Sequence, residues 1–132
     1  MKLYLDSSAI VKLVQTEPET AALRQFLAEH RDDEQVTSAL ARVEVLRAVW
    51  PGGVDAVASA RRTLLRRHLL ALDTDILDRA AVLVPDSSLR SLDAIHLASA
   101  ELLGADLRAV VTYDQRMASA AAGLRLPVAA PV

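Results

Sequence analysis

The 132-residue chain contains no cysteine, and only 3% of its residues are aromatic. Without cysteine it cannot form disulfides, thiolate zinc sites or a cysteine nucleophile, and it is compatible with a reducing cytoplasm. With so few aromatic side chains, the core has to be built from leucine, valine, isoleucine and alanine. Hydrophobic residues nevertheless make up 52% of the chain, which predicts a folded protein rather than a disordered one.

The chain also lacks a long hydrophobic run and a strong net charge. No uncharged apolar stretch approaches the ~20 residues needed to span a bilayer, and the apolar stretch at residues 3–5 is too short for a signal peptide. We therefore expect a cytoplasmic protein with no membrane partner. The formal net charge of −2 gives no general attraction to nucleic acid, so any polyanion has to be bound by local patches.

Short apolar segments alternate with helical patterns along the chain. Strands are predicted at residues 2–5, 35–38, 68–72, 109–112 and 126–128, and helices at 7–14, 18–30, 39–50, 54–67, 74–84, 92–103 and 115–123. This alternation predicts a mostly parallel sheet of four to five strands with helices on both faces, in one domain over residues 1–132.

Cap and turn residues mark the predicted element boundaries. Asp6, Ser38, Ser91 and Asp114 each precede a helical pattern and are predicted N-caps, because their side chains can accept a backbone N–H of the first turn. Residues 85–88 are predicted to form a turn.

Four acidic residues lie beside apolar segments: Asp6, Glu44, Asp93 and Asp114. Asp6 and Asp114 follow predicted strands, and ligand sites in parallel sheets lie beyond the carboxyl ends of the strands, so we expect these two acids to share one rim. Taken singly, Asp6, Asp93 and Asp114 are explained as helix caps or partners of a helix dipole. Capping does not explain Glu44, which has apolar neighbours on both sides.

Carboxylates gathered at one rim would repel one another, and a divalent cation relieves that repulsion. Carboxylates and water are the preferred ligands of Mg²⁺ and Mn²⁺, whereas zinc is not expected from a chain without cysteine and with three scattered histidines. Such a cation activates water and neutralises charge on an attacked phosphorus. The four acids therefore predict a metal-dependent enzyme that acts on phosphate esters. The hydroxyls of Ser7, Ser8 and Thr112 are placed to support a ligand carboxylate or a metal-bound water, although helix capping explains Ser8 equally well.

Four segments resemble the PIN-domain ribonucleases, and closely the VapC-type toxins of bacterial toxin–antitoxin pairs. They read LDSSA at residues 5–9, SALARVE at 38–44, LDAIHLA at 92–98 and VTYD at 111–114. One such segment alone is weakly specific, but all four in this order, at these spacings and in a chain of this size are specific.

The resemblance implies an α/β/α sandwich whose acids gather at one end of the sheet to hold Mg²⁺ or Mn²⁺. It implies that Asp6 and Asp93 ligate the metal, that Glu44 and Asp114 complete the acidic pocket, and that the Thr112 hydroxyl lies near the metal. The implied activity is endonucleolytic cleavage of RNA, usually tRNA or ribosomal RNA. The implied partners are a second copy of the chain in a homodimer and a cognate antitoxin that blocks the pocket.

Arginines supply most of the positive charge, and their planar forks suit phosphate better than lysine does. Arg42 and Arg116 lie near the predicted pocket in sequence and are candidate substrate contacts. Four more arginines cluster near the end of one predicted helix: Arg61, Arg62, Arg66 and Arg67. The favoured interpretation of this cluster is a solvated helix end that complements the dipole, with RNA contact as the alternative.

Two other functions remain open at this point. A receiver-type phosphoacceptor domain would need an acidic pair at the first strand and a lysine after the last core strand, but Ser7 follows Asp6 and both lysines are N-terminal. A non-catalytic PIN-like module that binds RNA or an antitoxin is the second alternative, and the intact acids argue against it.

Overall fold

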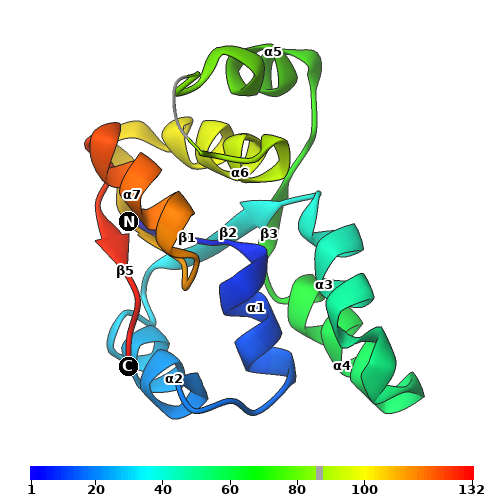
Figure 1. Ribbon diagram of the computed structural model, residues 1–132. Helices are drawn as coiled ribbons and strands as arrows, with labels where there is room; N and C mark the ends of the chain where they lie inside the picture. Colours follow the sequence, from blue (N-terminus) through cyan, green and yellow to red (C-terminus); the bar gives the residue numbers. More distant parts are fainter. Residues whose placement is uncertain (86–87) are drawn as a thin grey trace.

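The computed structural model describes residues 1–85 and 88–132, and it places a five-stranded parallel sheet between two layers of helices (Figure 1). The strands are β1 (Lys2–Leu5), β2 (Glu34–Ser38), β3 (His68–Leu70), β4 (Leu107–Val111) and β5 (Val128–Ala129). Their order is β3-β2-β1-β4-β5, and every neighbouring pair is parallel. The predicted α/β/α sandwich is therefore confirmed.

Two groups of helices cover the two faces of the sheet. The helices are α1 (Ser7–Val14), α2 (Thr20–Glu29), α3 (Ala41–Val49), α4 (Val54–Leu65), α5 (Thr74–Val82), α6 (Ser91–Glu101) and α7 (Gln115–Gly123). Helices α1 to α4 pack against one another, and α6 packs against both α5 and α7 (Figure 1). Among the helices that the structure describes, none has the length and apolar character needed to cross a membrane.

The central strand β1 supplies side chains to both layers because successive residues of a strand point to opposite faces. Leu3 and Leu5 pack into the core formed with α1 to α4, whereas Tyr4 packs with Val36 and Val110 beneath α6. Burial on both faces explains why the three residues after Lys2 in this strand are apolar or aromatic and fully buried, as is usual for parallel sheets.

The strand order reverses at β1, and this reversal creates the place for a ligand site. The chain runs outward from β1 to β2 and β3, and then crosses back to β4 on the other side of β1. Right-handed crossovers put the helices of these two directions on opposite faces, which leaves a crevice at the carboxyl ends of β1 and β4. Leu5 pairs with Val111 in register, so Asp6 lies beside Thr112 at this crevice.

The structure confirms two of the predicted caps and contradicts two. Asp6 and Asp114 cap α1 and α7 through their side chains. Ser38 does not cap α3, because it pairs with Leu70 as the last residue of β2 and the helix begins only at Ala41. Ser91 is the first residue of α6 rather than its cap, a position taken by Arg90 in extended conformation.

Other predicted boundaries shift by a few residues. Helix α2 begins at Thr20 instead of Pro18, since the buried Thr20 hydroxyl donates to the Lys12 carbonyl and accepts the Glu17 N–H. Strand β5 begins after Pro127, whose carbonyl still accepts the Val110 N–H. The turn predicted at 85–88 includes residues 86 and 87, which lie outside the described residues.

Candidate active site

Asp6 is a buried carboxylate that joins three elements at the end of β1. Its Oδ1 accepts hydrogen bonds from the Ser8 hydroxyl at 2.6 Å and the Ala9 N–H at 3.0 Å, and its Oδ2 accepts one from the Thr112 hydroxyl at 2.5 Å. Only 3% of the residue is exposed. Burial raises the pKa of the Asp6 carboxyl above its ordinary value, and the hydrogen bonds from Ser8 and Thr112 oppose that rise.

The Ser8 and Thr112 hydroxyls fix the ends of β1 and β4 to each other. Ser8 Oγ accepts the Tyr113 N–H at 3.0 Å, and Thr112 Oγ1 accepts the Asp114 N–H at 3.1 Å. Each hydroxyl thus donates to the Asp6 carboxylate and accepts from the backbone after β4. The structure therefore brings Ser8 and Thr112 together with Asp6, as the sequence predicted for hydroxyl groups that hold a ligand carboxylate.

Glu44 belongs to a series of hydrogen-bonded side chains that leads through His96 to Tyr4 on β1. Its Oε1 lies 2.6 Å from His96 Nε2 and accepts the Ser7 hydroxyl at 2.8 Å, and His96 Nδ1 lies 2.7 Å from the Tyr4 hydroxyl. Burial raises the pKa of Tyr4 above its ordinary value, so the hydroxyl stays protonated. We therefore assign Tyr4 as the donor to Nδ1 and the Nε2–H as the donor to Glu44.

His96 keeps Glu44 ionised. Partial burial raises the pKa of the Glu44 carboxyl, but the hydrogen bond from His96, together with the Ser7 hydroxyl and the nearby Arg90 charge, outweighs it, and the pKa is lowered overall. Neither Tyr4 nor His96 was among the site residues predicted from the sequence. A usable signal was the spacing of Asp93 and His96, which at i and i+3 on α6 share one face of the helix.

Arg90 lies between the other two acids. Its Nε donates to Asp93 Oδ2 and its Nη2 donates to Asp114 Oδ2, each at 3.0 Å. Its side chain is 63% exposed. Asp114 Oδ1 meanwhile accepts the backbone N–H groups of Arg116 and Met117, so Asp114 is both a helix cap and a member of the acidic cluster.

Three of the four predicted acids are thus linked by hydrogen bonds at the carboxyl edge of the sheet, and the fourth, Glu44, belongs to a separate hydrogen-bonded chain with Ser7 and His96. One path runs from Asp6 through Thr112 to Asp114 and then through Arg90 to Asp93. Glu44 is coupled to this path electrostatically, because the Arg90 charge helps to lower its pKa. We call these four residues, Asp6, Glu44, Asp93 and Asp114, the acidic cluster.

The donor atoms of the acidic cluster suit a hard divalent cation. They are carboxylate oxygens, and those of Asp6 accept hydrogen bonds from hydroxyl groups. The positive charge of the Arg90 guanidinium already lies between the carboxylates of Asp93 and Asp114. Among the described residues, however, no three acidic or histidine side chains stand close enough to hold a metal ion as they are. A fit to a cation therefore requires the carboxylates to move closer together, and the exposed Arg90 side chain, which bonds to Asp93 and Asp114, to leave them.

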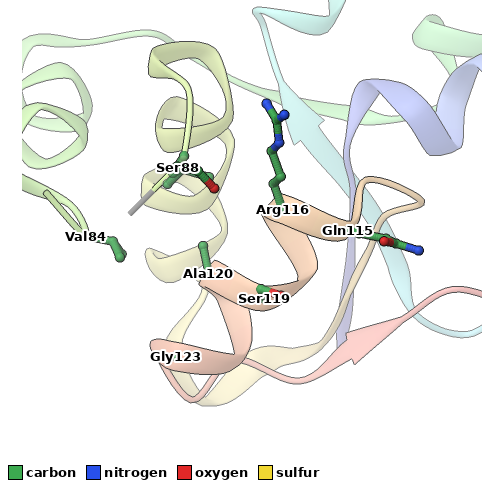
Figure 2. Close-up of a pocket in the computed structure, with 8 residues that line it drawn as sticks. Val84, Ser88, Gln115, Arg116, Ser119, Ala120 and Gly123 are labelled. Atoms are coloured by element: carbon green, nitrogen blue, oxygen red, sulfur yellow. The ribbon is translucent and has the colours of Figure 1, made fainter. Parts of the chain in front are cut away.

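The two candidate substrate arginines lie in different places. Arg116, in the first turn of α7, lines a cavity of about 380 Å³ next to Asp114, and Figure 2 shows Ser88 and Val84 on the segment opposite this helix. Arg42 lines a separate cavity of about 450 Å³ between α3 and α4, together with Leu46. Arg116 thus adjoins the acidic cluster through its backbone N–H bond to Asp114, whereas Arg42 lines a cavity with residues of α4 and with Leu69. Their role in substrate binding stays a prediction.

Comparison with known proteins identifies the family of this chain. The PIN domain family matches residues 3–123. Ribonuclease VapC46 of Mycobacterium tuberculosis (strain ATCC 25618 / H37Rv) is 50% identical over 129 residues, which cover 98% of this chain and 97% of that protein. Ribonuclease VapC35 of the same organism is 45% identical over 134 residues, with 98% and 96% coverage. The chain therefore belongs to the PIN domain family, and within it to the VapC ribonucleases.

Two solved structures share the fold. Mycobacterium tuberculosis VapC20, described as a Sarcin-Ricin loop cleaving toxin, superposes with a TM-score of 0.75 at 16% identity, covering 89% of this chain and 94% of that one. A toxin-antitoxin complex from Klebsiella pneumoniae gives a TM-score of 0.74 at 22% identity, with 98% of each chain covered. At these identities the likeness supports the fold alone.

The raised pKa of Asp6 predicts that Asp6→Asn stabilises the metal-free protein at alkaline pH. Asparagine caps helices as well as aspartate and carries no charge to desolvate. Because the folded-state pKa of Asp6 is above the unfolded value, ionisation of this group lowers stability as pH rises between the two. We expect Tm in EDTA at pH 8.5 to increase by roughly 2–5 °C, and the gain to shrink towards pH 4.5.

Asp73→Asn is the matched control, because Asp73 caps α5 through the same side-chain bond, to the Ile76 N–H, at an exposed position. Differential scanning calorimetry of the three proteins measures both effects. A lower Tm for Asp6→Asn at every pH would show that the Asp6 charge is structural.

Proposed function

We propose that this protein is a metal-dependent endoribonuclease that acts as the toxin of a toxin–antitoxin pair. The observation that carries the proposal is the acidic cluster at the strand-order reversal, in a chain that is 50% identical to ribonuclease VapC46 over nearly its whole length. The class of reaction is hydrolysis of an RNA phosphodiester by activated water.

The cation is Mg²⁺ or Mn²⁺, held by Asp6 and Asp93 with Glu44 and Asp114 completing the pocket. When bound, the cation supplies an activated water and neutralises charge that develops on the phosphate. The support for this assignment is the all-oxygen donor set and the guanidinium between Asp93 and Asp114.

The protein's own side chains prepare the acids for this role. Ser8 and Thr112 hold both oxygens of Asp6, so that its carboxylate has one orientation before any ligand arrives. His96 Nε2–H holds Glu44 in the ionised form, and Tyr4 fixes the imidazole from the other side. Arg116 at the neighbouring cavity is placed to bind a phosphate of the substrate.

The proposed partners follow from the family. The substrate is structured RNA, either tRNA or ribosomal RNA, and the regulator is a cognate antitoxin protein that covers the acidic cluster in the cytoplasm. The Klebsiella pneumoniae complex, which has the same fold, supports a protein partner. We further propose that the toxin is a homodimer.

Neutralising either of the surest ligands is expected to abolish cleavage. Asp6→Asn and Asp93→Asn each remove one carboxylate charge from the acidic cluster, and we expect the cleavage rate to fall by roughly 100-fold or more. The measurement is single-turnover cleavage of purified tRNA and ribosomal RNA with Mg²⁺, with end mapping of the products.

Asp75→Asn controls for the loss of one negative charge, because Asp75 is an exposed residue of α5. It should retain full activity, and EDTA should abolish the activity of the wild type. Undiminished cleavage by both Asp6→Asn and Asp93→Asn would refute the proposed function.

Removing Arg90 is expected to improve metal binding. The guanidinium occupies the space between Asp93 and Asp114 and competes with a cation for both carboxylates. We expect Arg90→Gln to bind Mn²⁺ roughly threefold to tenfold more tightly in isothermal titration calorimetry, and Asp93→Asn to bind it more weakly.

Arg79→Gln is the control, because Arg79 forms a similar two-bonded pair with Glu101, away from the acidic cluster. Its affinity for Mn²⁺ should equal that of the wild type. Weaker Mn²⁺ binding by Arg90→Gln than by Arg79→Gln would mean that Arg90 supports the metal site instead of competing with it.

A further inference from the structure

The four arginines that the sequence groups together separate in the structure. Arg62 and Arg66 are four residues apart and therefore lie on one side of the chain, where they meet Arg67 and, from α2, Arg24. Arg61 is absent from this group; it lines one cavity with Trp50 and other residues near the α3–α4 turn, and a second one with Arg42 and Arg67. Arg61, Arg62 and Arg66 are exposed, as expected for a solvated helix end, whereas Arg67 is partly buried.

Arg24, Arg62, Arg66 and Arg67 surround a small polar cavity of about 160 Å³ between α1, α2 and α4, which we call the arginine cavity. Its remaining lining residues are Leu13, Ser59 and Thr63. The two hydroxyl groups, on Ser59 and Thr63, add uncharged donors to the four guanidinium groups.

Within the described part of the chain, no ion pair compensates the positive charge of the arginine cavity. In residues 1–85 and 88–132, none of its four arginines forms an ion pair with a carboxylate. Arg24 Nη2 donates to the Leu13 carbonyl at 3.2 Å, and Arg67 Nη1 donates to the Thr63 carbonyl at 2.6 Å. Clustering four like charges without a partner is unfavourable, and an anion removes the cost.

Arg67 is the most constrained member of the arginine cavity. Its Nε is buried and has no hydrogen-bond partner. Burial, together with the charges of Arg66 and Arg24, lowers the pKa of Arg67 to about 10. Capping of the α4 carbonyls explains its bond to Thr63, but it does not explain the unpaired Nε or the three arginines around it.

The chemistry that fits the arginine cavity is a phosphate group. Guanidinium forks present paired N–H donors that match two phosphate oxygens, and several of them together favour a doubly or singly charged tetrahedral oxyanion. The apolar lining is limited to Leu13, so a nucleobase or an apolar side chain finds little to pack against.

The arginine cavity lies away from the acidic cluster but in the same helical layer. Helix α1 starts beside Asp6, and Leu13 is six residues along it from Ser7, roughly 9 Å at the rise of an α-helix. Arg66 and Arg67 precede His68, the first residue of β3, and so they lie towards the amino ends of the strands. A phosphate bound here belongs to a different nucleotide from the one cleaved at the acids.

We propose that the arginine cavity binds a backbone phosphate of the RNA remote from the cleaved bond, and so anchors the substrate along the α1–α4 layer. The inference rests on the proposed function, because RNA is taken as the ligand. It assigns to the enzyme a sequence-independent contact that adds affinity and salt dependence rather than base recognition.

The test is RNA binding by inactive protein, measured without cleavage. In an Asp93→Asn background, fluorescence anisotropy follows a labelled oligouridine of about 20 nucleotides over a range of salt concentrations. We expect the double change Arg62→Gln and Arg66→Gln to weaken binding roughly tenfold and to reduce the salt slope by about 0.7 for each phosphate that the variant no longer binds. Both arginines are exposed, which spares the fold.

The double change Arg31→Gln and Arg125→Gln is the matched control. It removes the same charge from exposed residues outside the arginine cavity. RNA affinity should fall less than about twofold, because neither residue adjoins the bound phosphate. Equal reductions for the two double variants would overturn the proposal, since the effect would then be one of net charge alone.

A second readout uses the buried Arg67 side chain, which is left unchanged. Its Nε–H signal in proton–nitrogen NMR should shift when the oligouridine is added, and this shift should be absent in the Arg62→Gln, Arg66→Gln protein. A shift with inorganic phosphate alone, with RNA affinity unaffected by the double change, would identify a free-anion site and overturn the RNA assignment. The RNA assignment would also be overturned if the Arg62→Gln, Arg66→Gln change weakened the binding of an acidic partner protein and left RNA binding unchanged.

Failure of this inference can be told apart from failure of the proposed function. If Asp6→Asn and Asp93→Asn still cleave RNA, the acidic cluster is not the catalytic centre, but the anisotropy result for the arginine cavity is unaffected. If cleavage depends on the acids and the arginine variants bind RNA normally, only the anchoring role is refuted.

Discussion

Repulsion among carboxylates at the carboxyl edge of the sheet is the constraint on which the rest of the site depends. The strand order brings the ends of β1 and β4 together, so acids that follow these strands cannot avoid one another. The protein offsets the repulsion with donors and cations placed on each acid in turn: Ser8 and Thr112 on Asp6, His96 on Glu44, and Arg90 on Asp93 and Asp114. The acidic edge is thus kept folded by groups that also fix the directions of its carboxylates.

Helix capping and catalytic placement are not competing explanations for Asp6 and Asp114. One oxygen of Asp6 caps α1 while the other accepts the Thr112 hydroxyl, and one oxygen of Asp114 caps α7 while the other pairs with Arg90. The cap fixes the direction of the carboxylate, because the helix N-terminus is itself fixed by the strand before it. An acid that caps a helix after a strand is therefore already oriented towards the site.

The hydrophobic periodicity of the sequence predicted the sheet and the position of Asp6 and Asp114 at its edge. It did not predict side-chain pairs between elements that are distant in the sequence. Strand ends depend on local apolar runs, so Asp6 and Asp114 could be placed on one rim from the sequence alone. The pairs Arg90–Asp114 and His96–Glu44 could not be predicted, because their members lie 24 and 52 residues apart in the sequence and no local pattern encodes such pairs. The prediction of Ser38 as a cap was wrong for the same reason, since its pairing with Leu70 across the sheet extends β2.

The protein has to attract a polyanion although its formal net charge is −2 and its proposed catalytic edge is acidic. Coulomb attraction at that edge is absent until a cation is bound, so the first contacts with RNA have to form elsewhere. The arginine cavity meets this need, because its charge is concentrated, unpaired and set apart from the acids. If the two proposals hold, anchoring is separated from chemistry: the acids keep a negative potential that attracts a cation, and the arginines bind the phosphates of the RNA at a distance from them.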